Sequence, residues 1–146
     1  MSLSPDPAGS SGTPLPKKLG YRDGDRVLFL ALPAELAALR GVRAFAAIEE
    51  SDWAGLLPEG PGFDVVHGFA TRRAELEGGA MALRRRVAPA GMVWISWPKQ
   101  ASKVPTDLTD NVIREVLLPT GLVDVKVAAL DAVWSGLKLM IRRELR

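Results

Sequence analysis

The stretch Ala90-Gly91-Met92-Val93-Trp94-Ile95-Ser96-Trp97-Pro98-Lys99-Gln100 decides the fold. Its centre, residues 92–97, is apolar on both faces of an extended chain, which is typical of a strand inside a parallel sheet covered by helices. Pro98 has no N–H to donate, so we expect the strand to end there. A polar loop from Lys99 to Asp107 follows and leads into a helix. Ligands in open α/β sheets bind at this place, outside the carboxyl end of a strand.

Hydrophobic patterning predicts further strands and helices on both sides of this stretch. Strands are expected at 26–32, 42–48, 63–70, 123–129 and 137–142, and helices at 13–19, 33–40 and 72–87, with another that starts near Asp107. Thr13 is the expected N-cap of the first helix, and Gly78-Gly79 predicts a bend or a close contact in the 72–87 helix. Residues 131–136 are expected to close a hairpin. The order predicts an α/β fold with a mostly parallel sheet and an antiparallel end. We expect residues 1–12 to be a disordered tail and 13–146 to form one domain.

The charges of the chain are nearly balanced. Nineteen basic and 17 acidic residues give a formal net charge of +2, which does not point to a polyanionic partner, so no nucleic acid is expected. Arg84-Arg85-Arg86 suits the end of a helix, and the basic residues near the C-terminus suit a solvated edge. A nucleic-acid site would need interleaved aromatic residues or further basic clusters on the same face.

Several classes of site and location are disfavoured by composition. The chain has no cysteine and one histidine, His67, so we expect no metal site and no disulfide. His67 lies within an apolar strand and is expected to be a core residue. No apolar run approaches the roughly 20 residues of a membrane span, and no signal peptide pattern is present. We therefore expect a cytoplasmic protein that does not bind membranes.

The loop after the central strand holds the best candidate ligand site. A helix N-terminus presents unpaired N–H groups that favour anions, and two lysines and two hydroxyls beside it would complete a cradle for a phosphate or carboxylate. The alternatives are that Asp107 caps the helix itself and that the lysines are simply solvated. The candidate residues are Lys99, Ser102, Lys103, Thr106 and Asp107, with Lys17, Lys18, Trp97, Lys126, Trp134 and Ser135 as secondary candidates. No Gly-x-Ser-x-Gly motif surrounds a serine, so no catalytic residues are assigned.

Three segments resemble class I methyltransferases, which have a Rossmann-like sheet ending in an antiparallel hairpin. They are Gly24-Asp25-Arg26-Val27-Leu28-Phe29-Leu30, Phe63-Asp64-Val65-Val66 and Val87-Ala88-Pro89-Ala90-Gly91-Met92-Val93-Trp94-Ile95. The resemblance implies an S-adenosylmethionine site, with Glu49 or Glu50, just past the second strand, binding a ribose hydroxyl. The turn that should be glycine-rich instead reads Ala31-Leu32-Pro33-Ala34-Glu35-Leu36. Because this turn has no glycine, we expect the cofactor site to be lost and no cofactor to bind, and the alternative role of Glu49 and Glu50 is that of solvated turn carboxylates. One helix–strand unit of the fold is also missing or shortened between Glu49 and Phe63.

A second resemblance covers the chain from Ser11 onward. It is to a small bacterial family of unknown function, and that family brings no activity or catalytic residues. The likeness is carried by Ser11-Gly12-Thr13-Pro14-Leu15-Pro16-Lys17-Lys18-Leu19-Gly20, Trp97-Pro98-Lys99 with Thr106-Asp107-Leu108-Thr109, and Gly121-Leu122-Val123-Asp124-Val125-Lys126 with Trp134-Ser135-Gly136-Leu137.

Three hypotheses follow from the sequence. The first is a non-catalytic Rossmann-like module that binds a small anionic molecule or a protein partner at the Lys99–Asp107 loop. The second is an enzyme, a divergent S-adenosylmethionine-dependent methyltransferase. The third is a structural dimerisation module that uses the final hairpin. A monomer and a homodimer are both compatible with the sequence.

Overall fold

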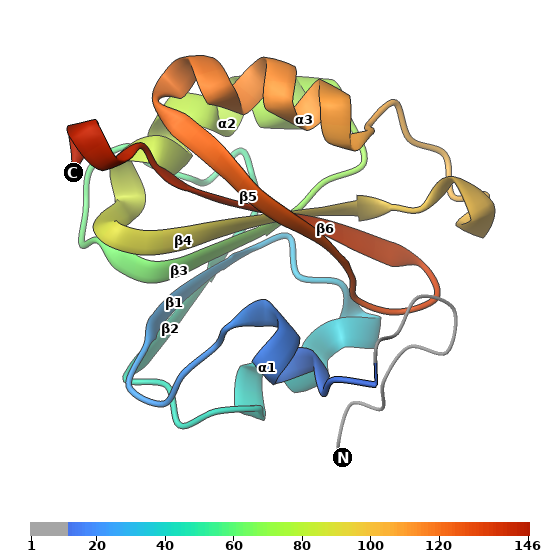
Figure 1. Ribbon diagram of the computed structural model, residues 1–146, viewed down its shortest axis with the longest axis horizontal. Coiled ribbons are helices and arrows are strands. Elements are labelled where there is room, and N and C mark those ends of the chain that lie inside the picture. Colours follow the sequence, from blue (N-terminus) through green and yellow to red (C-terminus); the bar gives the residue numbers. More distant parts are fainter. Residues whose placement is uncertain (1–11) are drawn as a thin grey trace.

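Six strands form one sheet in the order β2-β1-β3-β4-β6-β5 in the computed structural model, which describes residues 12–146 (Figure 1). β1 to β4 run parallel to one another, and β6 pairs antiparallel with both β4 and β5. The strands are β1 Arg26–Leu30, β2 Ala47–Ser51, β3 Phe63–Phe69, β4 Val87–Pro98, β5 Leu122–Ala129 and β6 Trp134–Ile141. The predicted fold class, a mostly parallel α/β sheet with an antiparallel end, is confirmed.

Helices cover both faces of the sheet, as the apolar central strand requires. One face carries the two long helices and the other carries α1 with a 3₁₀ segment (Figure 1). The helical segments are α1 Leu15–Leu19, η1 Ala34–Gly41, α2 Arg73–Arg86, η2 Gln100–Ser102, α3 Asp110–Leu117, η3 Leu118–Thr120 and η4 Arg143–Leu145. Trp97 packs in the core on the α2–α3 face, and Trp94 packs in the core on the α1 face. Their opposite parity on β4, which can be read from the sequence, places one indole in each layer.

Several element boundaries differ from the predicted ones. The first helix starts at Leu15, and Pro14 takes the N-cap position without a side-chain cap, so Thr13 is not the cap. The segment after β1 is a kinked 3₁₀ helix, with non-helical angles at Leu36. The second strand starts at Ala47 instead of residue 42. The hairpin turn is shorter than 131–136, because Trp134 already pairs with Pro98. The predicted tail lies outside the described residues, except for Gly12.

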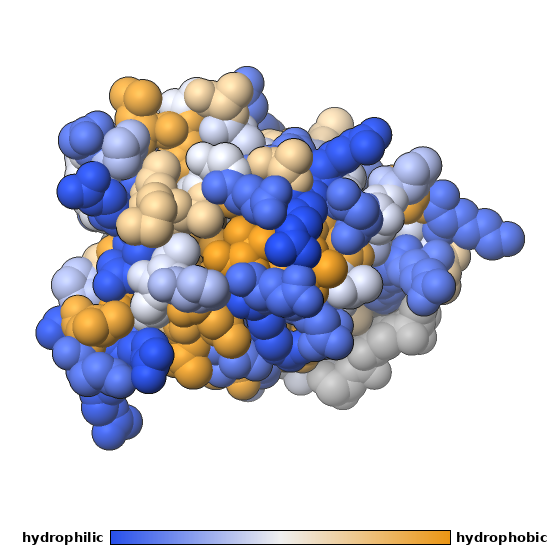
Figure 2. All heavy atoms as spheres, turned by 90° about the horizontal axis from the view of Figure 1, so that it is seen from above, coloured by the Kyte–Doolittle hydropathy of each residue, from blue (hydrophilic) through white to orange (hydrophobic). Residues whose placement is uncertain are grey.

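The α2–α3 face is held together by an apolar layer and by ion pairs at its margin. Figure 2 looks onto this face and shows apolar side chains at its centre, surrounded by hydrophilic ones. At the β5 margin, Arg114 of α3 pairs with Asp124 of β5 at 3.0 Å and with Asp110 at 2.9 Å. Exposed pairs of this kind stabilise by up to about 1 kcal/mol each. Burial of the apolar layer therefore dominates the attachment of these helices.

Candidate functional site

The described residues form two hollows at the carboxyl edge of the parallel strands. The first lies after β1 and β2, and the second lies after β4. Between them, Thr71 accepts hydrogen bonds at its carbonyl oxygen from Thr106 Oγ1 at 2.6 Å and from the Asp107 N–H at 3.3 Å. This is the edge at which open α/β sheets bind ligands.

The first hollow has a volume of about 600 Å³ and is open to solvent on one side. It carries two carboxylates and no cation. Its lining consists of Ala31, Asp52, Trp53, Ala54, Leu56, Ala74, Glu75 and Gly78. Glu75 is engaged in the structure, because its Oε1 accepts the N–H groups of Thr71 and Arg72 at 3.1 Å. Asp52 accepts the Gly55 N–H at 2.7 Å through Oδ1, and its second oxygen has further acceptor capacity.

Trp53 forms the floor of this hollow. Its indole Nε1 donates to the Phe69 carbonyl oxygen at 2.8 Å, and only 8% of the residue is exposed. The ring fits between two glycines, since a Cβ added to Gly68 or Gly79 would lie 2.7 Å from an indole carbon. Sequence analysis predicted a close contact or a bend at Gly78-Gly79, and the close contact is confirmed at Gly79.

The turn after β1 has a backbone conformation that glycine usually adopts, but it offers fewer free backbone N–H groups than a glycine-rich turn. Ala31 has φ 55°, a left-handed conformation that costs a non-glycine residue of order 1 kcal/mol or more. Its N–H already donates to the Ser51 carbonyl at 2.8 Å, and Pro33 has no N–H. Neither residue can therefore supply a backbone donor to a ligand at this turn.

The predicted ribose-binding carboxylates are not past the second strand but inside it. Glu49 and Glu50 pair with Leu28 and Phe29 across the β1–β2 register. Glu50 accepts two hydrogen bonds from Arg40, which lowers the pKa of its carboxyl and raises that of Arg40. The residue just past the strand is Asp52. Sequence analysis missed it because the strand is offset by several residues from the apolar run at 42–48.

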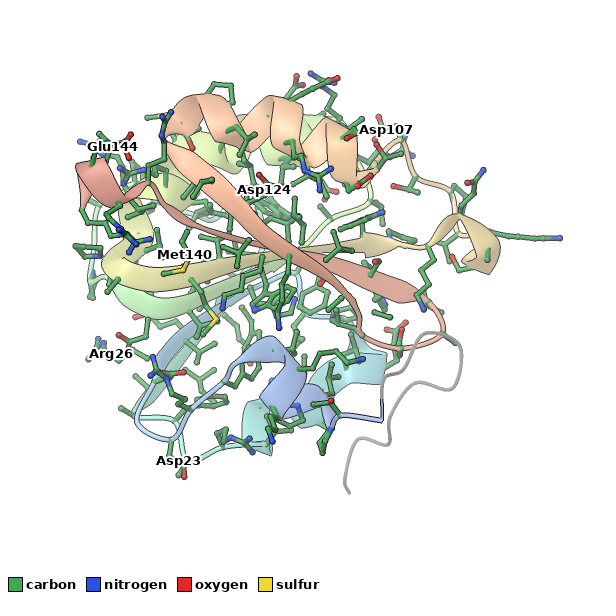
Figure 3. The ribbon with its side chains drawn as sticks, in the orientation of Figure 1. Asp23, Arg26, Asp107, Asp124, Met140 and Glu144 are labelled. Atoms are coloured by element: carbon green, nitrogen blue, oxygen red, sulfur yellow. The ribbon has the colours of Figure 1, made fainter. Side chains whose placement is uncertain are left out.

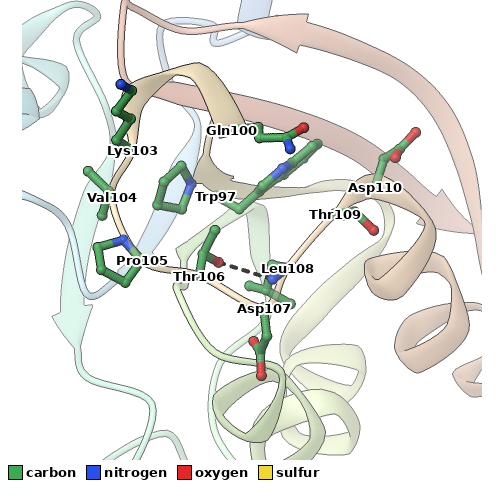
Figure 4. A pocket seen from close by; sticks show the side chains of 11 residues that line it. Trp97, Gln100, Lys103, Val104, Pro105, Thr106, Asp107, Leu108, Thr109 and Asp110 are labelled. Atoms are coloured by element: carbon green, nitrogen blue, oxygen red, sulfur yellow. Dashed lines mark hydrogen bonds between the residues drawn. The ribbon is translucent and has the colours of Figure 1, made fainter.

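The second hollow has a volume of about 550 Å³ and lies over the indole of Trp97 (Figure 4). It coincides with most of the predicted Lys99–Asp107 loop. Its lining is Trp97, Pro98, Gln100, Lys103, Val104, Pro105, Thr106, Asp107, Leu108, Thr109 and Asp110. Two carboxylates and one ammonium line it, which disfavours a small anion and differs from the predicted cradle.

Both candidate hydroxyls of the loop are engaged in local structure. Ser102 Oγ donates to the Lys99 carbonyl oxygen at 2.6 Å, and Thr106 Oγ1 accepts the Leu108 N–H at 3.0 Å besides donating to Thr71 (Figure 4). Lys103 takes a left-handed backbone at the end of η2, and its ammonium extends away from the Trp97 ring (Figure 4). Lys99 does not line the hollow. The two hydroxyl groups that were predicted to donate to a phosphate therefore form hydrogen bonds that stabilise the loop itself.

Asp107 caps the helix α2, and not the helix that was predicted to start near Asp107 itself. Its Oδ1 accepts the Arg73 N–H of α2 at 2.7 Å, and Figure 4 shows its carboxylate directed toward that helix. α3 starts at Asp110 instead, and its N-cap Thr109 accepts the Val112 N–H at 3.2 Å. The expected helix N-terminus beside Asp107 therefore belongs to α2, and Asp107 itself occupies it.

The secondary candidates divide between two places. Lys18 Nζ donates to the Ala129 carbonyl at 3.0 Å and Lys126 Nζ donates to the Lys18 carbonyl at 3.1 Å, so these lysines fasten α1 to β5. Lys17 is exposed on α1. Trp134 and Ser135 pair with Pro98 and Trp97 across the β4–β6 register. The structure thus brings these two next to the loop but leaves the three lysines on the α1 side.

His67 lies at the centre of the α1 face. Its Nδ1 is 2.5 Å from the Tyr21 hydroxyl and its Nε2 is 2.7 Å from Ser96 Oγ. Complete burial lowers the pKa of His67 to about 3 and raises that of Tyr21 well above its usual value. The neutral ring therefore donates through one nitrogen and accepts through the other, with Phe69 stacked on it at 4.3 Å between centroids. This is the core role that the sequence predicted.

Neither a metal site nor a membrane span is found in the part of the chain that the structure describes. Residues 12–146 contain no group of three histidine, aspartate or glutamate side chains arranged to hold a metal ion. Within the same residues, no helix has the length and apolar character needed to cross a bilayer.

Comparison with solved structures gives matches to methyltransferase-like folds. A TehB-like SAM-dependent methyltransferase from Corynebacterium glutamicum matches with a TM-score of 0.61 and 8% identity, over 86% of this chain and 85% of that one. A putative sarcosine dimethylglycine methyltransferase from Galdieria sulphuraria matches with a TM-score of 0.63 and 10% identity, over 88% and 84%. TrmN from Thermus thermophilus matches with a TM-score of 0.55 and 14% identity, over 87% of this chain and 47% of its own, so the chain spans about half of TrmN.

Sequence comparison does not add to this. No family model matches the chain, and no curated protein is similar to it. The resemblance to a small bacterial family of unknown function stays a prediction. At these identities the structural matches establish the fold alone, and the fold is that of the class I S-adenosylmethionine-dependent methyltransferases.

Proposed function

We propose that the chain is a divergent S-adenosylmethionine-dependent methyltransferase that binds its cofactor in the first hollow. The observation that carries the proposal is the position of Asp52, one residue past β2, in a hollow that also contains the end of β1 and the start of α2. The structural matches favour this function over a non-catalytic module, which was the leading prediction from the sequence.

The residues of the first hollow fit an adenosyl sulfonium group in their chemistry. Asp52 has an oxygen available to accept a ribose hydroxyl, and the carboxylates of Asp52 and Glu75 favour a cation over an anion. The Trp53 floor provides apolar contact for the adenine. When bound, the cofactor would supply an electrophilic methyl group. The chain's own part is to hold the ribose and the base, while the turn at Ala31 and Pro33 offers few donors for the methionine carboxylate.

The second hollow is the place that we propose for the methyl acceptor. Two of its lining residues are bonded to the start of α2, which also lines the first hollow: Asp107 accepts the Arg73 N–H and Thr106 donates to the Thr71 carbonyl oxygen. Trp97, Pro98, Pro105 and Leu108 give it an apolar part, and Asp107 and Asp110 also line it. A neutral or cationic acceptor with an apolar part suits this lining.

Calorimetric titration with S-adenosylmethionine and S-adenosylhomocysteine tests the proposal. Asp52→Asn should weaken binding about tenfold to a hundredfold, since it removes a charge-assisted hydrogen bond. Glu59→Gln is the matched control, because Glu59 is an exposed carboxylate in the same loop that does not line the hollow. Saturable binding that only Asp52→Asn weakens supports the proposal. Absence of binding to both compounds, or equal effects of the two substitutions, contradicts it.

A non-catalytic module that binds a small anion or a protein at the Lys99–Asp107 loop is the second candidate. The hollow of about 550 Å³ at this loop favours a binding site there, and its two carboxylates favour a protein partner over a small anion. Thermal unfolding in the presence of inorganic phosphate tests the anion, because a ligand at 100 times its Kd stabilises by about 2.7 kcal/mol. A shift that Lys99→Ala with Lys103→Ala abolishes supports this candidate. A shift with S-adenosylmethionine alone supports the methyltransferase instead.

A further inference from the structure

Two basic segments that lie far apart in the sequence meet at one end of the molecule. Arg84, near the end of α2, and Leu145, in η4, both close on Gly121: a Cβ added to Gly121 would lie 3.4 Å from Arg84 Nε and 2.7 Å from Leu145 Cδ1. A hollow of about 360 Å³ beside them is lined by Leu118, Leu122, Val123, Arg142, Arg143 and Glu144. Figures 1 and 3 place this end, with Glu144 and the C-terminus, opposite the end that holds Asp107.

Positive charge is concentrated at this arginine end, which we define as residues 81–86, 118–123 and 141–146. These segments contain six arginines and one glutamate, a formal charge of +5. The whole chain carries +2, so the remainder carries −3. An asymmetry of this size produces a local positive potential that attracts a polyanion even though the net charge is small.

Most of these arginines are not neutralised by carboxylates. Arg86 is buried, donates to the Leu57 and Pro61 carbonyls and pairs with Glu49 at 3.7 Å. Arg142 pairs with Glu144 at 3.2 Å. The described residues place no carboxylate within ion-pair distance of Arg84, Arg85, Arg143 or Arg146. Arg84 Nε is in addition buried without an acceptor among these residues.

Stabilisation of the α2 helix explains the presence of only some of these arginines. Cations at a helix C-terminus complement its dipole by about 0.3–1 kcal/mol each, which accounts for the arginines of α2. Arg143 and Arg146 belong to the C-terminal segment and do not complement the dipole of α2. Arg146 Nε donates to the Ile141 carbonyl oxygen at 2.8 Å. Because Leu145 and Arg84 both approach Gly121, the C-terminal segment that carries these arginines lies beside the end of α2. A second basic cluster next to that of α2 is one of the two conditions for a nucleic-acid site.

We propose that the arginine end binds the phosphate backbone of a nucleic-acid duplex without reading its sequence. Guanidinium groups match phosphate oxygens in a bidentate fashion. A duplex is favoured over a single strand because every large apolar side chain exposed among the described residues is aliphatic, so none can stack on a base. A membrane surface is disfavoured because η4 spans only Arg143–Leu145 and presents no long apolar helix face.

Fluorescence anisotropy of a labelled DNA duplex tests this surface on the full chain. Four phosphate contacts predict that log Kobs falls with log salt with a slope of about −3 to −4. Arg85→Gln with Arg143→Gln should weaken binding about tenfold or more at 50 mM salt and reduce that slope by about 2. Lys17→Gln with Arg22→Gln is the matched control, since it removes two exposed positive charges elsewhere on the molecule.

Three outcomes would overturn the proposal. The first is no duplex binding at low salt. The second is equal weakening by the Arg85–Arg143 pair and by the control pair, which would mean that only total charge matters. The third is tighter binding to single-stranded DNA or to vesicles of anionic lipid than to the duplex. None of these depends on the methyltransferase proposal, because S-adenosylmethionine binding is tested on a different edge with different variants.

Discussion

Trp53 and Phe69 are joined by a hydrogen bond of 2.8 Å from the indole Nε1 to the carbonyl oxygen. The bond ties the loop after β2 to the carboxyl end of β3, at the switch point where an open α/β sheet receives a ligand. The indole thereby fixes the depth of the first hollow. Gly68 and Gly79 make this possible, because a side chain at either position would collide with the ring.

The two glycines of α2 should respond in opposite ways to alanine. Gly78→Ala meets nothing within 4 Å and should stabilise by about 0.5–1 kcal/mol through helix propensity. Gly79→Ala would place its Cβ 2.7 Å from Trp53 and should destabilise by about 1–3 kcal/mol through overpacking. Urea unfolding of the two variants measures the difference, and equal effects would contradict the close packing of Trp53.

Protonation of His67 should destabilise the fold in acid. Burial lowers its folded pKa to about 3, below an unfolded value of about 6.5. The unfolded state therefore binds the proton first, and stability should fall as pH decreases from about 6.5 toward 3. Between pH 7 and pH 5 the loss should be about 2 kcal/mol. Urea unfolding at the two pH values measures it, and His67→Gln should remove most of this dependence. The same slope in His67→Gln would assign the effect to other groups.

Two buried tryptophans, of which only one has a hydrogen-bonded indole N–H, allow the contribution of that hydrogen bond to stability to be measured. Trp94 Nε1 donates to the Leu19 carbonyl at 2.8 Å, whereas Trp134 Nε1 is buried without an acceptor in the described part of the chain. Substitution of tryptophan by phenylalanine reduces the side-chain volume by the same amount at either position. Trp94→Phe should therefore cost about 1–3 kcal/mol more than Trp134→Phe, since it leaves a buried carbonyl unsatisfied. Thermal unfolding compares them, and a smaller loss for Trp94→Phe would contradict this assignment.

Asp107 and Thr109 should each stabilise a different helix. Asp107→Ala should destabilise by about 1 kcal/mol and speed hydrogen exchange in the first turn of α2, because it removes the acceptor of the Arg73 N–H. Thr109→Ala should have a similar cost but speed exchange at the start of α3, near Val112. Residue-resolved hydrogen exchange distinguishes them. Faster exchange in α3 with Asp107→Ala would restore the capping role predicted from the sequence.

The sequence by itself determined the layers of this protein. The unbroken apolar run at 92–97 requires helices on both faces, and the opposite parity of Trp94 and Trp97 assigns one indole to each. The alternation in the last 25 residues predicts the antiparallel end. The lone histidine in an apolar strand predicts a core residue. These features could be predicted because burial imposes a period on the side chains of each strand and helix.

Only the tertiary structure decided what the polar residues at the sheet edge do. Asp107 caps α2, which ends 21 residues before it in the chain, and Thr106 is bonded to Thr71. Asp52, not Glu49 or Glu50, faces the first hollow, because the start of β2 depends on pairing with β1. Arg84 of α2 and Leu145 of η4 converge on Gly121 although some 60 residues separate them. Polar partners of this kind are chosen by contacts distant in sequence, and no local pattern records them.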